Sequence, residues 1–311
     1  GEMQKALDYY NQSLPLRRAA KDKPGEAITL NNIGRAYDVL GAQREAIANY
    51  EQALQIAKAA NARNTEAQTL NYMGLAHWSA QEYSQAIETL EQALAISREA
   101  KNPALESAVL NNLGLVYNAT GEWRKAIESL NQSLPLTQQT GNVQYQAYAL
   151  NNLGFAHEGL GEKEEAVKAH TQALELARQV RDTQREAKIR FGIARIESSR
   201  NRLKQAREQI EKTVKIAEST RSKLASPELR ADYRASVQRY YDLYIDVLMR
   251  MGRRAPKSNL IAEALQVSER ARARSLIELL AESNADIRQG VDPALVDRER
   301  ELQDQVNEKT T

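Results

Sequence analysis

The stretch Leu30–Gly34, LNNIG, decides the fold because it returns along the chain at a fixed interval. It recurs as LNYMG at Leu70 and as LNNLG at Leu110 and Leu150, so the sequence repeats every 40 residues. A fixed period between about 20 and 50 residues is the signature of an array of small structural units. We therefore predict that the first two thirds of the chain form a repeat array.

Each copy predicts two helices joined by a tight turn. Helical spacing of apolar residues runs through a first segment such as Ala27–Leu40 and a longer second segment such as Arg44–Ala59. Glycine inside the first helix costs about 1 kcal/mol relative to alanine. We therefore expect another helix to approach closely at Gly34, with Ala46 on the facing surface. The linkers after second helices carry residues that suit capping or left-handed conformations, namely Asp22, Asn102, Asn142 and Asp182.

Composition favours helices and excludes several classes of function. Hydrophobic residues make up 42% of the chain and aromatic residues 5%, and no run alternates with the period of a strand. Cysteine is absent, which removes disulfides and thiolate chemistry. The net charge of +2 gives no electrostatic footprint for nucleic acid. We expect no cofactor, no metal and no catalytic set of side chains.

The same text gives no sign of a membrane protein. No apolar stretch approaches the roughly 18 residues that a membrane helix needs, and the opening GEMQKALDYY lacks the basic start and apolar core of a signal peptide. We therefore expect a cytoplasmic protein without a membrane partner.

The small and aromatic positions resemble those of the tetratricopeptide repeat (TPR) family. The residues that carry this resemblance are Gly34, Ala46, Tyr37, Tyr50, Ala53, Ala93 and Tyr117. The 40-residue spacing is similar to the long-helix subclass of kinesin light chains and bacterial signalling arrays. The resemblance implies an all-α fold in which helix-turn-helix units stack into a right-handed superhelix. We place this array at residues 1–220, with a partial first copy, four complete copies and a degenerate last copy. In that last copy RFGIA, from Arg190, replaces the repeated five-residue sequence, which we call the repeated phrase.

Residues 221–311 are predicted to form a non-repeat helical extension. Tyr233–Leu248 carries four tyrosines at helical spacing, which we interpret as core packing rather than an interface. The next segment carries Arg270, Arg272 and Arg274 together with Glu263, Glu269 and Glu278, which favours solvated or intrahelical pairing over nucleic-acid binding. The last segment, residues 292–306, has heptad-like apolar positions that suit a partner helix, so a homo-oligomer through residues 227–311 is possible.

This extension resembles the junction of bacterial proteins that join TPR arrays to a CHAT domain, a caspase-like peptidase module. The text SERARAR from Ser268, followed by SLIELLAE from Ser275, is the most specific part. The resemblance implies a peptidase domain beyond Thr311 that uses a His and Cys pair. No catalytic residue carries over, because the chain has no cysteine, and its histidines are expected to be structural: His77, His157 and His170.

The repeated phrase also predicts a binding face. On a helical wheel Leu30, Ile33 and Gly34 share one arc, while Asn31 and Asn32 flank the opposite direction. Stacking would align that face into a concave groove. The predicted peptide-binding residues are Asn31, Asn32, Arg35, Asp38, Asn71, Tyr72, Leu75, Trp78, Asn111, Asn112, Leu115, Asn118, Asn151, Asn152, Phe155 and Glu158.

A row of carboxamides can pair with both the N–H and the C=O of an extended peptide. In peptide-binding TPR proteins such asparagines hold ligand backbone, so the resemblance implies a module that binds a protein or peptide segment and couples it to its own C-terminal domain. Two alternatives stay open. The asparagines can instead bond to neighbouring copies and stabilise the stack, and the chain can serve as a structural scaffold or oligomerisation platform.

Overall fold

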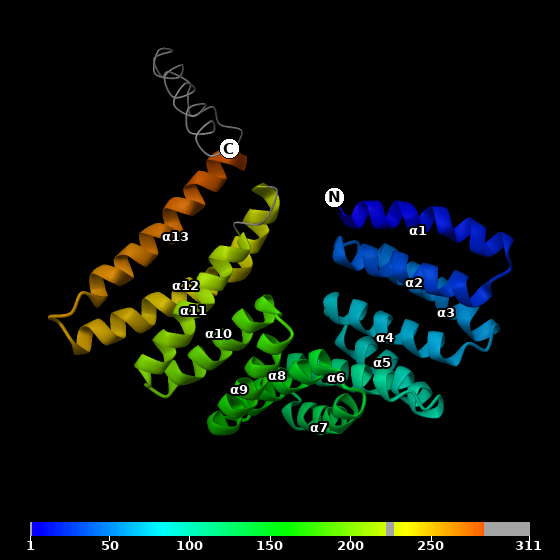
Figure 1. Ribbon diagram of the computed structural model, residues 1–311, viewed down its shortest axis with the longest axis horizontal. Coiled ribbons are helices and arrows are strands. Elements are labelled where there is room, and N and C mark those ends of the chain that lie inside the picture. The colour runs from blue at the N-terminus through cyan, green and yellow to red at the C-terminus, as the bar shows by residue number, and fades with distance from the viewer. Residues whose placement is uncertain (1, 222–226, 283–311) are drawn as a thin grey trace, which may run out of the picture. The chain divides into compact units, whose positions relative to one another are not determined.

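The computed structural model describes residues 2–221 and 227–282, which form helices joined by short turns (Figure 1). No strand occurs among these residues, and the predicted all-α class is confirmed. The chain divides after Thr213 into two compact units. The helices are α1 (Glu2–Ala19), α2 (Lys23–Val39), α3 (Gln43–Ala59), α4 (Arg63–Ser79), α5 (Tyr83–Glu99), α6 (Pro103–Thr120), α7 (Trp123–Gln139), α8 (Val143–Gly159), α9 (Lys163–Gln179), α10 (Thr183–Ser199), α11 (Leu203–Arg221), α12 (Pro227–Arg254) and α13 (Leu260–Glu282).

The turns of the first unit recur at half the sequence period. Each contains one residue with positive φ, a conformation that glycine adopts at least cost, as at Gly41 with φ of 76°. The left-handed positions are Lys21, Gly41, Asn61, Gln81, Lys101, Gly121, Gly141, Gly161, Arg181 and Asn201. The predicted capping role of the linker residues is confirmed, since Asp22, Asn102, Asn142 and Asp182 each accept a hydrogen bond from the backbone N–H three residues later.

The glycine of the first helix marks a close helix contact, as the sequence predicts, and the atoms nearest to it belong to the large side chain four residues after the expected alanine. A Cβ added at Gly34 would lie 2.5 Å from Cε1 of Tyr50, and one at Gly114 would lie 2.5 Å from Cγ of Leu130. The equivalent of Ala46 in the next copy, Ala86, lies on the facing helix as expected, with its backbone carbonyl 3.4 Å from a Cβ added at Gly74. Ala46 itself is fully buried. The side chain of Tyr50, four residues later, fills the space beside Gly34.

Consecutive helices of the first unit lie side by side in chain order (Figure 1). The first helices of successive copies also contact one another, in the pairs α2–α4, α4–α6, α6–α8 and α8–α10. Each first helix is therefore covered from two directions, by the second helix of its own copy and by the first helices of its neighbours. A large apolar core from α4 to α10 follows, in which Leu90, Leu130 and Ile189 are fully buried, and smaller apolar clusters lie among α1 to α4.

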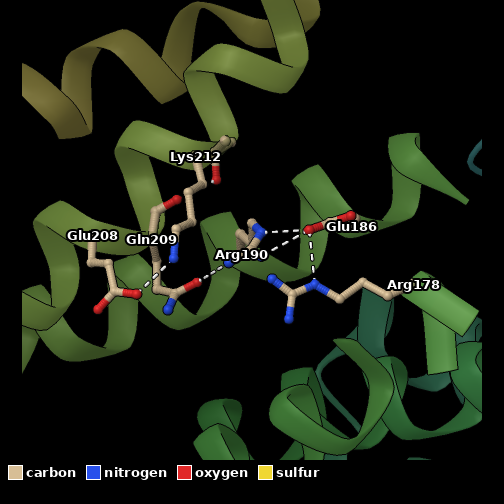
Figure 2. A network of polar contacts seen from close by, with 7 residues as sticks. Arg178, Glu186, Arg190, Glu208, Gln209 and Lys212 are labelled. Carbon is tan, nitrogen blue, oxygen red and sulfur yellow. Dashed lines mark hydrogen bonds and ion pairs between the residues drawn. The ribbon is translucent and has the colours of Figure 1, made fainter. Parts of the chain in front are cut away.

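The last copy replaces an apolar core position with a charge. Arg190 lies where the other copies have leucine, and it is only 2% exposed. Figure 2 shows how it is held: its guanidinium donates to Glu186 at 2.8 Å and to Gln209 of α11 at 2.5 Å. Arg178 donates to the same carboxylate at 3.1 Å. The buried charge is thus neutralised and hydrogen-bonded within the array.

The second unit contains the end of α11 together with α12 and α13. Tyr240, Tyr241 and Tyr244 of α12 are buried, which confirms the interpretation as core residues for these three, whereas Tyr233 is half-buried. Two of their hydroxyls are also engaged, since Tyr241 donates to Glu218 at 3.4 Å and Tyr244 donates to Glu263 at 2.9 Å. The predicted helix at residues 292–306 lies outside the described residues.

Candidate functional site

The first asparagine of each phrase is buried between copies. Asn31, Asn71, Asn111 and Asn151 are 2–5% exposed. Asn31 donates through Nδ2 to Oγ1 of Thr69 at 2.8 Å. The expectation that these asparagines face away from the packing is therefore wrong. The wheel gave each first helix a single buried arc, whereas the first helices of neighbouring copies cover a second arc.

The first and second asparagines form a ladder along the stack. Asn112 donates to Oδ1 of Asn71 at 2.8 Å, and Asn152 donates to Oδ1 of Asn111 at 2.9 Å. Each rung joins the second position of one copy to the first position of the copy before it. Asn118 adds a bond to the backbone carbonyl of Asn152 at 2.9 Å. The carboxamides therefore bond between copies, as the stack-stabilising alternative expects.

Tyr72 interrupts this ladder at the second position. Its hydroxyl accepts a hydrogen bond from Nε2 of Gln68 at 3.0 Å. The guanidinium of Arg35 lies 5.3 Å from the centre of its ring, and the ring of Tyr50 lies 5.9 Å away. The side chain is half-buried, so one part of it remains available to a ligand.

Beside Tyr72 the first helices enclose a pocket of about 290 Å³. The pocket collects side chains from α4 and from the N-caps and first two turns of α6 and α8, and those side chains are uncharged. Burial raises the pKa of the Tyr145 phenol, so this group is neutral near pH 7. The lining residues are Asn64, Gln68, Asn71, Tyr72, Asn102, Ala104, Leu105, Ala108, Asn142 and Tyr145.

Sequence reasoning found only Asn71 and Tyr72 of this lining. It missed the others because they belong to the turns and first helical turns, which we interpreted as capping chemistry alone. The signal that could have found them is departure from the repeat: Gln68 stands where the neighbouring copies have Ile28 and Ala108. Asn102 and Asn142 do cap helices, and they line the pocket as well.

The predicted charged positions are engaged within the fold. Asp38 accepts a hydrogen bond from the Tyr50 hydroxyl at 2.6 Å, and burial raises the pKa of its carboxyl. Glu158 pairs with Arg195 of the next copy at 2.5 Å. Arg35 is exposed and lies over Tyr72. These contacts spread over several copies, so the structure does not gather the charged positions into one cluster.

The predicted apolar positions are half-buried rather than freely exposed. Phe155 meets the ring of His170 edge-on, with centroids 5.1 Å apart. Trp78 packs against the apolar core. Leu75 and Leu115 lie at the same position of α4 and α6 and are intermediate in exposure. Each can offer part of its side chain to a ligand without leaving its packing site.

The three histidines lie in structural contacts. Nδ1 of His77 lies 2.6 Å from Glu82, and Nδ1 of His157 lies 2.6 Å from Glu162, which in each case is the N-cap residue of the following helix. His170 is fully buried among apolar residues. Among the described residues, no group of three His, Cys, Asp or Glu side chains could hold a metal ion. None of the described helices combines the length and apolar character that a bilayer crossing requires.

Comparison with known proteins gives one family and several similar folds. The family model described as tetratricopeptide repeat matches residues 1–59, 65–139 and 145–219. No curated protein sequence matches the chain. The other similarities are to solved structures, whose identities to this chain are low enough that they bear on the fold alone.

Three of these structures illustrate the range. BtubC (BKLC) from P. vanneervenii has a TM-score of 0.62 and 16% identity, over 73% of this chain and 95% of that one. The apo form of RapI has a TM-score of 0.64 and 16% identity, over 88% and 92%. A signal transduction ATPase with numerous domains from Pyrococcus horikoshii, which has a tetratricopeptide repeat sensor, has a TM-score of 0.65 and 18% identity, over 89% of this chain and 42% of that one.

Proposed function

The chain belongs to the tetratricopeptide repeat family, and we propose that it is a non-catalytic module that binds a protein or peptide segment along the first helices of its copies. The observation that carries the proposal is the uncharged pocket of about 290 Å³ beside Tyr72, where α4, α6 and α8 converge. Pockets that bury a ligand side chain among aromatic and amide groups are suited to specific recognition.

The asparagine ladder indicates that the two asparagine positions of each copy, those of Asn31 and Asn32, have different roles. Asn71 and Asn111 are buried and bonded between copies, so their role in the proposal is to fix the spacing of the first helices. Ligand contact falls to half-buried side chains on the same face, such as Tyr72, Leu75 and Leu115. This division changes the choice of test residues, since replacing Asn111 would remove a packing interaction together with any ligand contact.

We further propose that occupancy of the array is conveyed to a C-terminal CHAT peptidase-like domain in a bacterial signalling protein. The support is the resemblance of the text around SERARAR and SLIELLAE, from Ser268 onward, to the junction that precedes such domains. Helices α12 and α13 would then be the connection between the array and that domain. Binding could act on the domain either by releasing or by restraining it.

A second candidate function is a scaffold that oligomerises through the extension. The observation that favours it is the exposure of two apolar side chains on α13, Ile261 at 45% and Leu265 at 62%. Sedimentation of the chain separates the two candidates. A tight dimer that is lost when Leu265 is changed to Asp favours the scaffold, and a monomer at all concentrations excludes oligomerisation through α13.

The binding proposal is tested by affinity capture with the full 311-residue chain, followed by sequencing of the captured segment. We expect Tyr72→Ala to reduce capture by about tenfold, because a central aromatic anchor typically contributes at least this much. Val180→Ala, at a partly exposed position after α9, is the matched control and should capture normally. Unchanged capture by Tyr72→Ala, with the same thermal midpoint as the control, would contradict the proposal.

A further inference from the structure

Three of the residues that line the pocket, Asn64, Gln68 and Tyr72, are positions at which the second complete copy differs from its neighbours. Tyr72 stands where the other three copies have asparagine. Asn64 stands where they have Pro24, Ala104 and Gln144. Equivalent positions in the other copies show which residues the packing of a copy requires. Substitutions that surround one cavity therefore indicate a role of that cavity beyond packing.

The pocket keeps unused hydrogen-bonding groups. Asn102 is engaged at both polar atoms, since it donates to Oδ1 of Asn64 at 2.9 Å and accepts from the backbone N–H of Leu105 at 3.1 Å. By contrast, the part of the chain that the structure describes offers no partner to Nδ2 of Asn64, to Nδ2 of Asn142 or to the hydroxyl of Tyr145. On the acceptor side, Oε1 of Gln68 is unused, because only its Nε2 is bonded, to Tyr72.

The absence of charge among the lining side chains decides between classes of ligand. A carboxylate entering the pocket would exchange part of its hydration for neutral amide and phenol groups and would meet no charged side chain of the lining, which is unfavourable. Arg35 is not a lining residue, and its guanidinium lies 5.3 Å from the centre of the Tyr72 ring. A neutral carboxamide offers a donor and an acceptor together. It therefore complements the Gln68 carbonyl oxygen and the amide and phenol donors opposite.

The volume of the pocket is large enough for an amino-acid side chain of a ligand. A space of about 290 Å³ corresponds to the liquid volume of about ten water molecules. It accommodates a glutamine or asparagine side chain with part of its flanking peptide. Ala104, Leu105 and Ala108 supply the apolar wall against which the methylene groups would lie.

We propose that this pocket binds the neutral carboxamide side chain of a glutamine or asparagine in the partner segment, and so sets the sequence preference of the array. The inference rests on the proposed function, because it assumes that a peptide segment lies along the first helices. It adds the chemical class of the side chain that is selected and assigns the selection to Gln68, Tyr72, Asn142 and Tyr145.

The test uses two small probes, N-acetyl-glutamine N-methylamide and its glutamate counterpart, titrated into the full chain at pH 7. We expect the glutamine probe to give saturable shifts in the side-chain amide NMR signals of Asn64 and Asn142, and the glutamate probe to bind at least about tenfold more weakly. Equal binding of the two probes, tighter binding of the glutamate probe, or no saturable binding of either would overturn the proposal.

A matched variant separates pocket chemistry from folding. Asn142→Asp keeps the helix cap, since Asp182 caps α10 in the same way, but it removes an amide donor and adds a charge. We expect it to weaken the glutamine probe at least fivefold, whereas Asn11→Asp on the exposed surface of α1 leaves binding unchanged. Equal probe binding by both variants would overturn the inference. The capture experiment with Tyr72→Ala reports on the proposed function separately, because it requires no particular side chain in the ligand.

Discussion

Helices α8 and α10 are the same element of two successive copies, yet they fill one core position with opposite chemistry. Leu150 in α8 packs in the apolar core, whereas Arg190 in α10 is buried with Glu186 and Gln209 around it (Figure 2). The two second helices differ in parallel, since α11 supplies Gln209 where α9 has Ala169. The register therefore determines where a side chain lies, and the partner helix determines which side chain can be accommodated there.

The largest expected effect on stability comes from replacing the buried charged residue, Arg190. Arg190→Ala leaves Gln209 without its donor and opens a cavity, so we expect a loss of about 3 kcal/mol in the free energy of unfolding. The double variant Arg190→Leu/Gln209→Ala restores Leu150 and Ala169 of the preceding copy and should cost less than about 1 kcal/mol, because well-packed apolar residues often replace a complete buried polar pair without loss. Urea unfolding with amide hydrogen exchange in α10 measures both. Equal losses in the two variants would show that the network itself supplies the stability.

The second expected effect concerns the fully buried His170 of α9, which takes the place of Leu90 and Leu130 in earlier copies. Within residues 2–221 and 227–282, neither of its ring nitrogens has a hydrogen-bond partner. Burial, and to a smaller extent the positive charge of Arg195, lowers the pKa of His170 to about 4 from an ordinary 6.5.

The sign of the pH dependence follows from this depressed pKa. Between pH 6.5 and about 4 the unfolded state binds the proton and the folded state does not, so stability falls as the pH falls through this window. The contribution is complete above pH 6.5 and amounts to about 3 kcal/mol at most. We expect His170→Leu to remove this component. The check is the difference in urea midpoint between the wild type and the variant across the window, and a constant difference would contradict the assignment.

The third expected effect uses the two glycines beside the same ring. A Cβ at Gly154 would lie 2.5 Å from Cε1 of His170, whereas a Cβ at Gly192 would lie 3.1 Å from its Nε2. Overpacking of a full core costs typically 1–3 kcal/mol, so Gly154→Ala should destabilise the array by about 2 kcal/mol, less whatever helix propensity returns. Gly192→Ala is the control and should cost less. Thermal unfolding ranks the two variants, and a larger loss at Gly192 would reverse the inferred geometry.

Much of the fold could be predicted from the recurrence of one phrase. The period places Gly34 and its equivalents at helix contacts and Asp22 and its equivalents at caps, because these roles depend on local geometry that every copy repeats. The ladder could not be predicted in this way. Asn71 bonds to Asn112 instead of facing solvent because of the way successive copies are rotated relative to one another. A helical wheel drawn for a single helix carries no information about that rotation. The pocket was missed for the same reason, since its walls come from three copies.

The smallest expected effect tests the ladder itself by comparing one register position in two copies. Asn112 donates to Asn71 at 2.8 Å, while no hydrogen bond of the Asn32 side chain occurs within the described residues. Replacing either residue with alanine gains the same helix propensity, so the difference between the two variants isolates the rung. We expect Asn112→Ala to be less stable than Asn32→Ala by about 1 kcal/mol, the net value of a buried hydrogen bond. Equal thermal midpoints would mean that the rungs align the copies without stabilising them, and the asparagines would then be retained for recognition.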